Sequence, residues 1–161
     1  MVDKAKHLLL GQAGEEAVSR HLGSRGWRIV ARNWRPGGMS RGLELDIVAM
    51  HGRCLVFVEV KTRRLSRDGL EHEPGPDLAG RPDMRPLRVP AYAALTPAKR
   101  KTLLRAAGHY LTAHDLWSAP CRFDLICVGR LFAEQLMLEH YRNVIELRQA
   151  VDSGNAAWQP W

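Results

Sequence analysis

The sequence has no long apolar run. No uninterrupted apolar stretch exceeds Cys54–Val58, which is far shorter than the roughly 20 residues that a helix needs to cross a bilayer. The apolar run at 8–10 is too brief for the core of a signal peptide. These absences predict a cytoplasmic protein that has no membrane among its partners.

Cysteine is scarce as well. The chain has three cysteines, Cys54, Cys121 and Cys127, and no CxxC pattern. An odd number of widely spaced cysteines argues against a disulfide framework and against a structural zinc site. Two of them lie within apolar runs, where a thiol packs as a small hydrophobic group. We therefore expect reduced cysteines in the core.

Acidic residues are outnumbered by basic ones. The chain has 17 Asp and Glu against 24 Lys and Arg, a formal net charge of +7 and a pI near 9.8. Such a charge attracts an anionic partner before any specific contact forms. Nucleic acid is the first partner of this kind to consider, and an acidic membrane surface is the second. The charge supports such a site but does not define one.

The chain does contain enough apolar sequence for one ordinary core. Its 161 residues match the size of one domain. Its hydrophobic fraction of 45% and charged fraction of 25% are typical of soluble globular proteins. We expect a single domain over residues 1–150, with a long proline-rich loop at 64–95, followed by a flexible tail at 151–161.

The spacing of apolar residues predicts two helices and four strands. The segment 131–139 fits either a helix or a strand, and 143–148 fits a short strand or a turn. A helix between two strands supplies the connection that a parallel crossover needs. The sequence therefore predicts an α/β fold with a mixed central sheet flanked by helices. In chain order we expect a helix over 5–23, strands over 27–34, 44–50 and 53–61, a helix over 96–114 that starts at Thr96-Pro97, and a strand over 122–128.

The segments 44–50 and 53–61 are predicted to form the two strands of a β-hairpin. If the chain turns tightly at 51–52, Met50 pairs with Arg53. In that register Asp46 and Glu59 become diagonal neighbours on one face of the sheet. Carboxylates in this position can lean together and share one cation.

Lys61 joins the two carboxylates, because alternate residues of a strand share a face. Asp46 and Glu59 offer the hard oxygen ligands that suit Mg²⁺ or Mn²⁺, and Lys61 can orient a water or neutralise an oxyanion. The alternative is a structural lysine–carboxylate cluster at a strand end. Charge inside the apolar run Val56–Lys61 favours the functional interpretation, because an unpaired buried carboxylate is costly.

Basic residues gather near these strands and early in the second helix. They are candidate phosphate contacts, and their alternative role is to form a solvated helix face. The candidates for binding nucleic acid are Arg63, Arg64, Lys99, Arg100, Lys101 and Arg105.

Several segments together resemble a known family. They are Gly11–Glu15, Arg32–Arg35, Glu44–Val48, Val56–Arg63, Lys99 and Arg122–Asp124. In combination they resemble the YraN-like family of bacterial proteins, over about residues 8 to 145. That family belongs to the restriction-endonuclease-like, PD-(D/E)xK nuclease superfamily, near the Holliday-junction resolvases.

The resemblance implies a metal-dependent endonuclease that hydrolyses phosphodiester bonds of DNA, branched or damaged, in repair or recombination. It implies metal binding by Asp46, Glu59 and Glu15, with Lys61 catalytic and Gln12 as a helper. A surface helical glutamate is the alternative interpretation of Glu15. The resemblance also implies a homodimer, because two symmetric cuts need two sites.

The sequence departs from the family pattern in two places. Leu43 stands where the family usually has glycine, and the excursion at 64–95 is longer than expected. Neither departure removes a metal ligand. Two other functions stay open: a nucleic-acid-binding module whose nuclease site is idle, and a structural protein that interacts through the helix around 99–111.

Overall fold

A computed structural model describes residues 2–37, 42–64, 95–130 and 136–145 of the chain. The predicted tail at 151–161 and nearly all of the predicted loop at 64–95 lie outside these ranges. Among the described residues, no helix combines the length and the apolar character that a membrane span requires.

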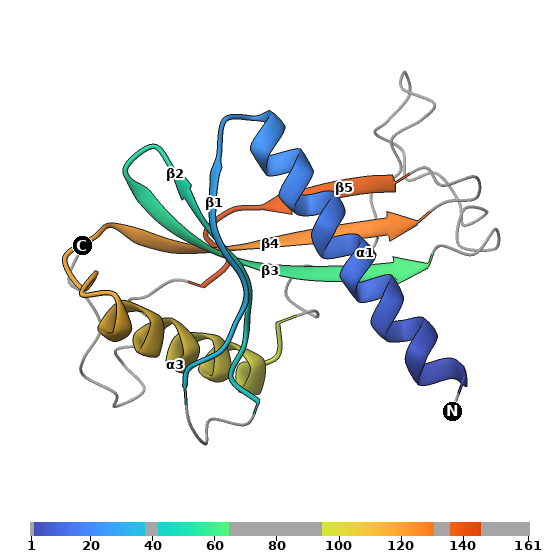
Figure 1. Cartoon of the computed structure of the whole chain (residues 1–161), viewed down its shortest axis with the longest axis horizontal. Coiled ribbons are helices and arrows are strands. Elements are labelled where there is room, and N and C mark those ends of the chain that lie inside the picture. Colours follow the sequence, from blue (N-terminus) through green and yellow to red (C-terminus); the bar gives the residue numbers. More distant parts are fainter. Residues whose placement is uncertain (1, 38–41, 65–94, 131–135, 146–161) are drawn as a thin grey trace, which may run out of the picture.

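The described residues form a mixed sheet with a helix on each face (Figure 1). The strand order is β1-β2-β3-β4-β5. The pair β3 and β4 is parallel, and the other neighbouring pairs are antiparallel. The predicted α/β fold is therefore confirmed. The elements are α1 (Val2–Ser24), β1 (Arg28–Trp34), β2 (Leu45–His51), β3 (Cys54–Arg64), α3 (Pro97–Ala113), β4 (Cys121–Arg130) and β5 (Leu136–Tyr141).

Each face of the sheet buries its own apolar core. On one face α1 contributes Val18 and Leu22, which cluster with Val56 and Val58 of β3. On the other face α3 packs against a larger cluster centred on Phe57, and the elements of that cluster include β2 and β4. Alternation along β3 separates the two cores, since successive side chains of a strand point to opposite faces.

The local signals at α3 act as predicted. The Thr96 hydroxyl accepts a hydrogen bond from the Lys99 N–H at 3.2 Å, which caps the first turn. Pro97 occupies the start of the helix, where its missing N–H costs nothing. The helix ends at Ala113, one residue before the predicted end.

The hairpin register differs from our expectation. His51, not Met50, forms the last pair before the turn, and its partner is Cys54. The turn is therefore Gly52-Arg53, and Gly52 takes a φ of +61°, which glycine adopts without strain. The predicted pairing of Met50 with Arg53 was wrong because the glycine stands at the first position of the turn.

The corrected register moves the two acidic residues closer together. The ladder reaches Ile47 paired with Val58, so the next position places Asp46 opposite Glu59. The observed pairing differs from the predicted pairing by two residues along one strand. Because this number is even, each side chain stays on the face of the sheet on which we predicted it.

The sequence left the structure of two segments, 131–139 and 143–148, undecided, and the described residues settle part of each. Residues Leu136–Tyr141 form strand β5, antiparallel to β4, so this part of 131–139 is a strand. Residues 143–145 form no strand, and the remainder of 143–148 lies outside the described residues. Cys121 and Cys127 are buried thiols, as expected of core cysteines.

Gly14 allows α1 to lie close against β3. A Cβ atom at this position would lie 1.9 Å from the Thr62 hydroxyl oxygen, far inside contact distance. The hydroxyl itself is buried without a hydrogen-bond partner. This close approach sets the distance of Glu15, the next residue, from the sheet.

We expect Gly14→Ala to destabilise the protein by about 1–3 kcal/mol, because the added methyl forces the helix and the strand apart. Urea unfolding would measure the change. Gly23→Ala is the matched control, since a Cβ there meets no atom within 4 Å and alanine favours a helix by up to about 1 kcal/mol. Equal stability of the two variants would contradict the close contact.

Candidate active site

Asp46 is fixed to the neighbouring strand by its own carboxylate. Its Oδ2 accepts a hydrogen bond from the Val60 N–H at 2.8 Å. The regular alternation of β2 is broken here, because Leu45 packs in the core on the α3 side while Ile47 packs in the core on the α1 side. Asp46 lies between them and faces a cleft at the edge of the sheet.

Glu59 is the most buried acidic residue of this region, with 3% of its surface exposed. Its Oε1 receives two ammonium groups, Lys61 Nζ at 3.0 Å and Lys99 Nζ at 2.9 Å. Its Oε2 is buried with no hydrogen-bond partner. One oxygen is therefore neutralised by two cations, and the other is left for a further ligand.

Glu15 reaches the same region from α1. Burial raises the pKa of its carboxyl group, a hydrogen bond with the Asn33 side chain opposes the rise, and the charge of Glu44 adds to it. Its Oε2 is also buried without a partner. The helix-borne acid that the family resemblance implied thus lies beside the two strand acids.

A cleft of about 480 Å³ lies between α1 and the ends of β1 and β2. Arg35 at its rim donates a hydrogen bond to Glu44 at 2.8 Å. The cleft is large enough to admit several waters or a phosphate group. Its lining consists of Gly11, Gln12, Glu15, Asn33, Arg35, Glu44 and Asp46.

Three negative side chains influence one another here. Burial raises the pKa of Asp46 to about 7, and the nearby carboxylate of Glu59 adds to the rise. The Val60 N–H and the Lys99 ammonium oppose it, while Glu15 contributes a further small increase. The carboxylates therefore form an electrostatically coupled group that two lysines only partly neutralise.

The donor chemistry of this group suits a divalent cation. Carboxylate oxygens are the ligands that Mg²⁺ and Mn²⁺ prefer, and a buried oxygen without a partner calls for one. Glu15 and Glu59 each present such an oxygen. In the described part of the chain, no three His, Cys, Asp or Glu side chains lie close enough together to hold a metal ion without some movement.

The structure places the predicted basic residues in different settings. Lys99 reaches into the site and pairs with Glu59, and Arg100 Nε donates to the Leu95 carbonyl at 3.1 Å. Lys101 and Arg105 are exposed on α3. The backbones of Arg63 and Arg64 pair with β4, and their side chains lie outside the described part.

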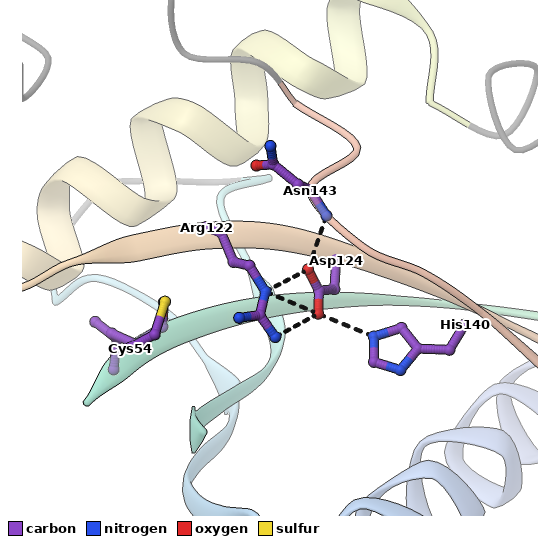
Figure 2. Close-up of polar contacts among 6 residues, drawn as sticks. Cys54, Arg122, Asp124, His140 and Asn143 are labelled. Atoms are coloured by element: carbon purple, nitrogen blue, oxygen red, sulfur yellow. Dashed lines mark hydrogen bonds and ion pairs between the residues drawn. The ribbon is translucent and has the colours of Figure 1, made fainter. Parts of the chain in front are cut away.

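Asp124 is a second buried acid, and the sequence did not assign it a role. It is 1% exposed, and its carboxylate accepts hydrogen bonds from Arg122, His140 and the Asn143 N–H (Figure 2). Burial alone would raise the pKa of Asp124, but these three donors bring it below its usual range. The available signal was an acidic residue within the apolar run of β4.

Asn33 was missed for a different reason. It adopts a left-handed φ of 49° near the end of β1, a conformation that asparagine tolerates better than most residues. Its side chain bonds to Glu15 across 18 positions of sequence. Sequence spacing contains no trace of that contact.

Comparison with protein families matches residues 14–128 to the model described as "Uncharacterised protein family UPF0102". A UPF0102 protein of Nitratidesulfovibrio vulgaris (strain DP4) is 41% identical over 161 residues, covering 100% of both chains. One of Oleidesulfovibrio alaskensis is 33% identical, covering 96% of this chain and 94% of its own. One of Geobacter sulfurreducens is 35% identical, covering 86% and 90%.

The raised pKa of Asp46 predicts how stability depends on pH without divalent cations. The carboxyl group titrates near 3.8 when unaffected by structure and near 7 in the folded protein, so between these values the folded state binds the extra proton. Stability should therefore fall as pH rises from about 4 to 7. Each pKa unit corresponds to about 1.4 kcal/mol.

Asp46→Asn should remove most of this dependence, leaving the smaller part that comes from Glu15, and be the more stable protein at pH 8, by on the order of 2–4 kcal/mol. Urea unfolding in EDTA across this pH range would measure the difference. A wild type whose stability rises over the same range, or a variant that is less stable than wild type at pH 8, would contradict the assignment.

Proposed function

This chain belongs to the UPF0102 family, the YraN-like family that its motifs resemble, and we propose that it is a metal-dependent nuclease that hydrolyses phosphodiester bonds of DNA. The observation that carries the proposal is the burial of Glu59 together with the unequal partners of its two carboxylate oxygens. Its carboxylate is buried in the middle strand, two lysines share one of its oxygens, and the other oxygen has no partner. A purely structural cluster of Glu59 and its two lysines has no need of two further carboxylates, Asp46 and Glu15, beside it.

Asp46, Glu59 and Glu15 would hold a Mg²⁺ or Mn²⁺ ion. Bound there, the ion supplies a Lewis acid for a phosphate oxygen and lowers the pKa of a water. The cleft beside Asp46 gives such a phosphate access from solvent. Gln12 lines the same cleft and can hydrogen-bond to a substrate oxygen.

Lys61 and Lys99 bring two positive charges to within 3.0 Å of the same carboxylate oxygen. Lys61 is partly exposed, so its ammonium can reach a reacting phosphate as well as Glu59. There it stabilises negative charge that develops as water attacks phosphorus. Lys99 comes from α3 and stays paired with Glu59 while Lys61 acts on the substrate.

The remaining parts of the proposal rest on charge and on family resemblance. The net charge of +7 favours a polyanionic substrate, and exposed Lys101 and Arg105 add positive charge to α3. We place the chain in the restriction-endonuclease-like superfamily, acting on branched or damaged DNA as a cytoplasmic homodimer. The order of strands and the two acids on adjacent strands support this placement.

Cleavage of labelled branched, flapped and linear DNA in Mg²⁺ or Mn²⁺ tests the activity. We expect Asp46→Asn, Glu59→Gln and Lys61→Ala each to lower the cleavage rate by at least about a hundredfold, as is typical when an electrostatic catalyst is removed. DNA binding should persist in Lys61→Ala with a modest loss.

Arg53→Ala is the matched control for Lys61→Ala. It removes one positive charge from an exposed position in the hairpin turn before β3, six residues from Glu59 along the chain. Its cleavage rate should equal that of wild type. Binding of DNA without cleavage on any substrate would favour the idle binding module, and indifference to both DNA and RNA would favour a structural protein.

Metal binding has its own measurement, independent of cleavage. Mn²⁺ should raise the melting temperature of wild type, because an ion that binds only the folded state stabilises it by mass action. The rise should be lost in Glu59→Gln and kept in Arg53→Ala. An equal rise in Glu59→Gln would place the ion elsewhere.

A further inference from the structure

A second cleft, of about 300 Å³, lies between the start of α3 and the end of β5. Leu95 and Arg100 line it from the side of α3, and the segment His140–Val144 lines it from the side of β5. Two arginines, Arg100 and Arg142, therefore line one hollow. Its described lining includes no carboxylate, so the cleft suits an anion.

The wall formed by the end of β5 is held in place by a buried acid. Asp124 accepts hydrogen bonds from the Asn143 N–H at 3.0 Å and from His140 Nε2 at 2.9 Å (Figure 2). The Val144 N–H donates to the Phe123 carbonyl at 2.8 Å. Residues on both sides of Arg142 are thus tied to β4.

The turn after Arg142 has a defined backbone conformation. Asn143 has a φ of +51°, in the left-handed region that asparagine adopts more readily than most residues other than glycine. Its N–H bond to Asp124 holds this turn in place. The Arg142 side chain is exposed beside it, so the turn presents a cation to solvent.

The opposite wall connects this cleft to the acidic site. Arg100 follows Lys99 on α3, and successive helical residues point about 100° apart. Lys99 turns toward Glu59, and Arg100 is held by the Leu95 carbonyl at the second cleft. Leu95 and Val144 border both this cleft and the surroundings of Glu59. The two sites are therefore neighbours.

We propose that the Arg100–Arg142 cleft binds a backbone phosphate of the same DNA strand that the acidic site cuts, on one side of the scissile bond. Guanidinium groups are suited to phosphate oxygens because their planar N–H groups can bind two oxygens at once. The inference rests on the proposed function. It adds that the strand runs past the start of α3 toward the end of β5.

Fluorescence anisotropy of labelled duplex DNA, in EDTA so that nothing is cut, tests this subsite. Arg142→Ala should weaken binding by about three- to tenfold at ~100 mM salt, and it should reduce the slope of log affinity against log salt by about one. Arg142→Lys should retain the slope and recover part of the affinity. Arg53→Ala, which removes the same charge from the hairpin turn, should change neither.

The outcomes separate the subsite from the nuclease proposal. The subsite alone is overturned if wild type binds and cuts DNA and Arg142→Ala has the same affinity for DNA and the same salt slope. Wild type that binds no DNA overturns both. If millimolar inorganic phosphate raises the melting temperature of wild type but not of Arg142→Ala, while DNA affinity is equal in the two, the cleft binds a small free anion and the assignment to a DNA strand is wrong.

Discussion

Burying the carboxylate of Glu59 in the middle strand constrains what surrounds it. An isolated charge in such a place costs several kcal/mol, so its partners must be present and well positioned. One partner, Lys61, comes from the same strand, and the other, Lys99, comes from α3. The start of α3 is thereby tied to the sheet by an ion pair, in addition to the packing of its apolar residues.

The acidic site needs both faces of the sheet. Glu15 arrives with α1 on one side and Lys99 with α3 on the other, and they meet where β1 and β2 curve away from β3 (Figure 1). The break in alternation at Asp46 lies at this point. Close packing at Gly14 brings α1 near enough for Glu15 to influence the pKa of Asp46. The site therefore forms where two helices, α1 and α3, meet the same part of the sheet.

A second buried acid serves a different role on the neighbouring strand. Asp124 forms an ion pair with Arg122, accepts a hydrogen bond from His140 and holds the end of β5 through the Asn143 N–H. Its pKa is lowered, whereas that of Asp46 is raised. The contrast follows from their partners: Asp124 has hydrogen-bond donors on all sides, and Asp46 has other carboxylates nearby. A satisfied acid is typical of structure, and an unsatisfied acid is typical of a site.

The sequence by itself determined every described helix and strand except β5, the faces on which the hairpin side chains lie and the presence of acids within apolar strands, because these depend on short-range propensity and on residue periodicity. It located Asp46, Glu59 and Lys61, and resemblance added Glu15. Only the tertiary structure decided that Lys99 completes the group, that Asn33 supports Glu15 and that Asp124 anchors Asn143. Those contacts join residues from 18 to 40 positions apart. Such distances are set by how helices and strands pack, which local sequence does not encode.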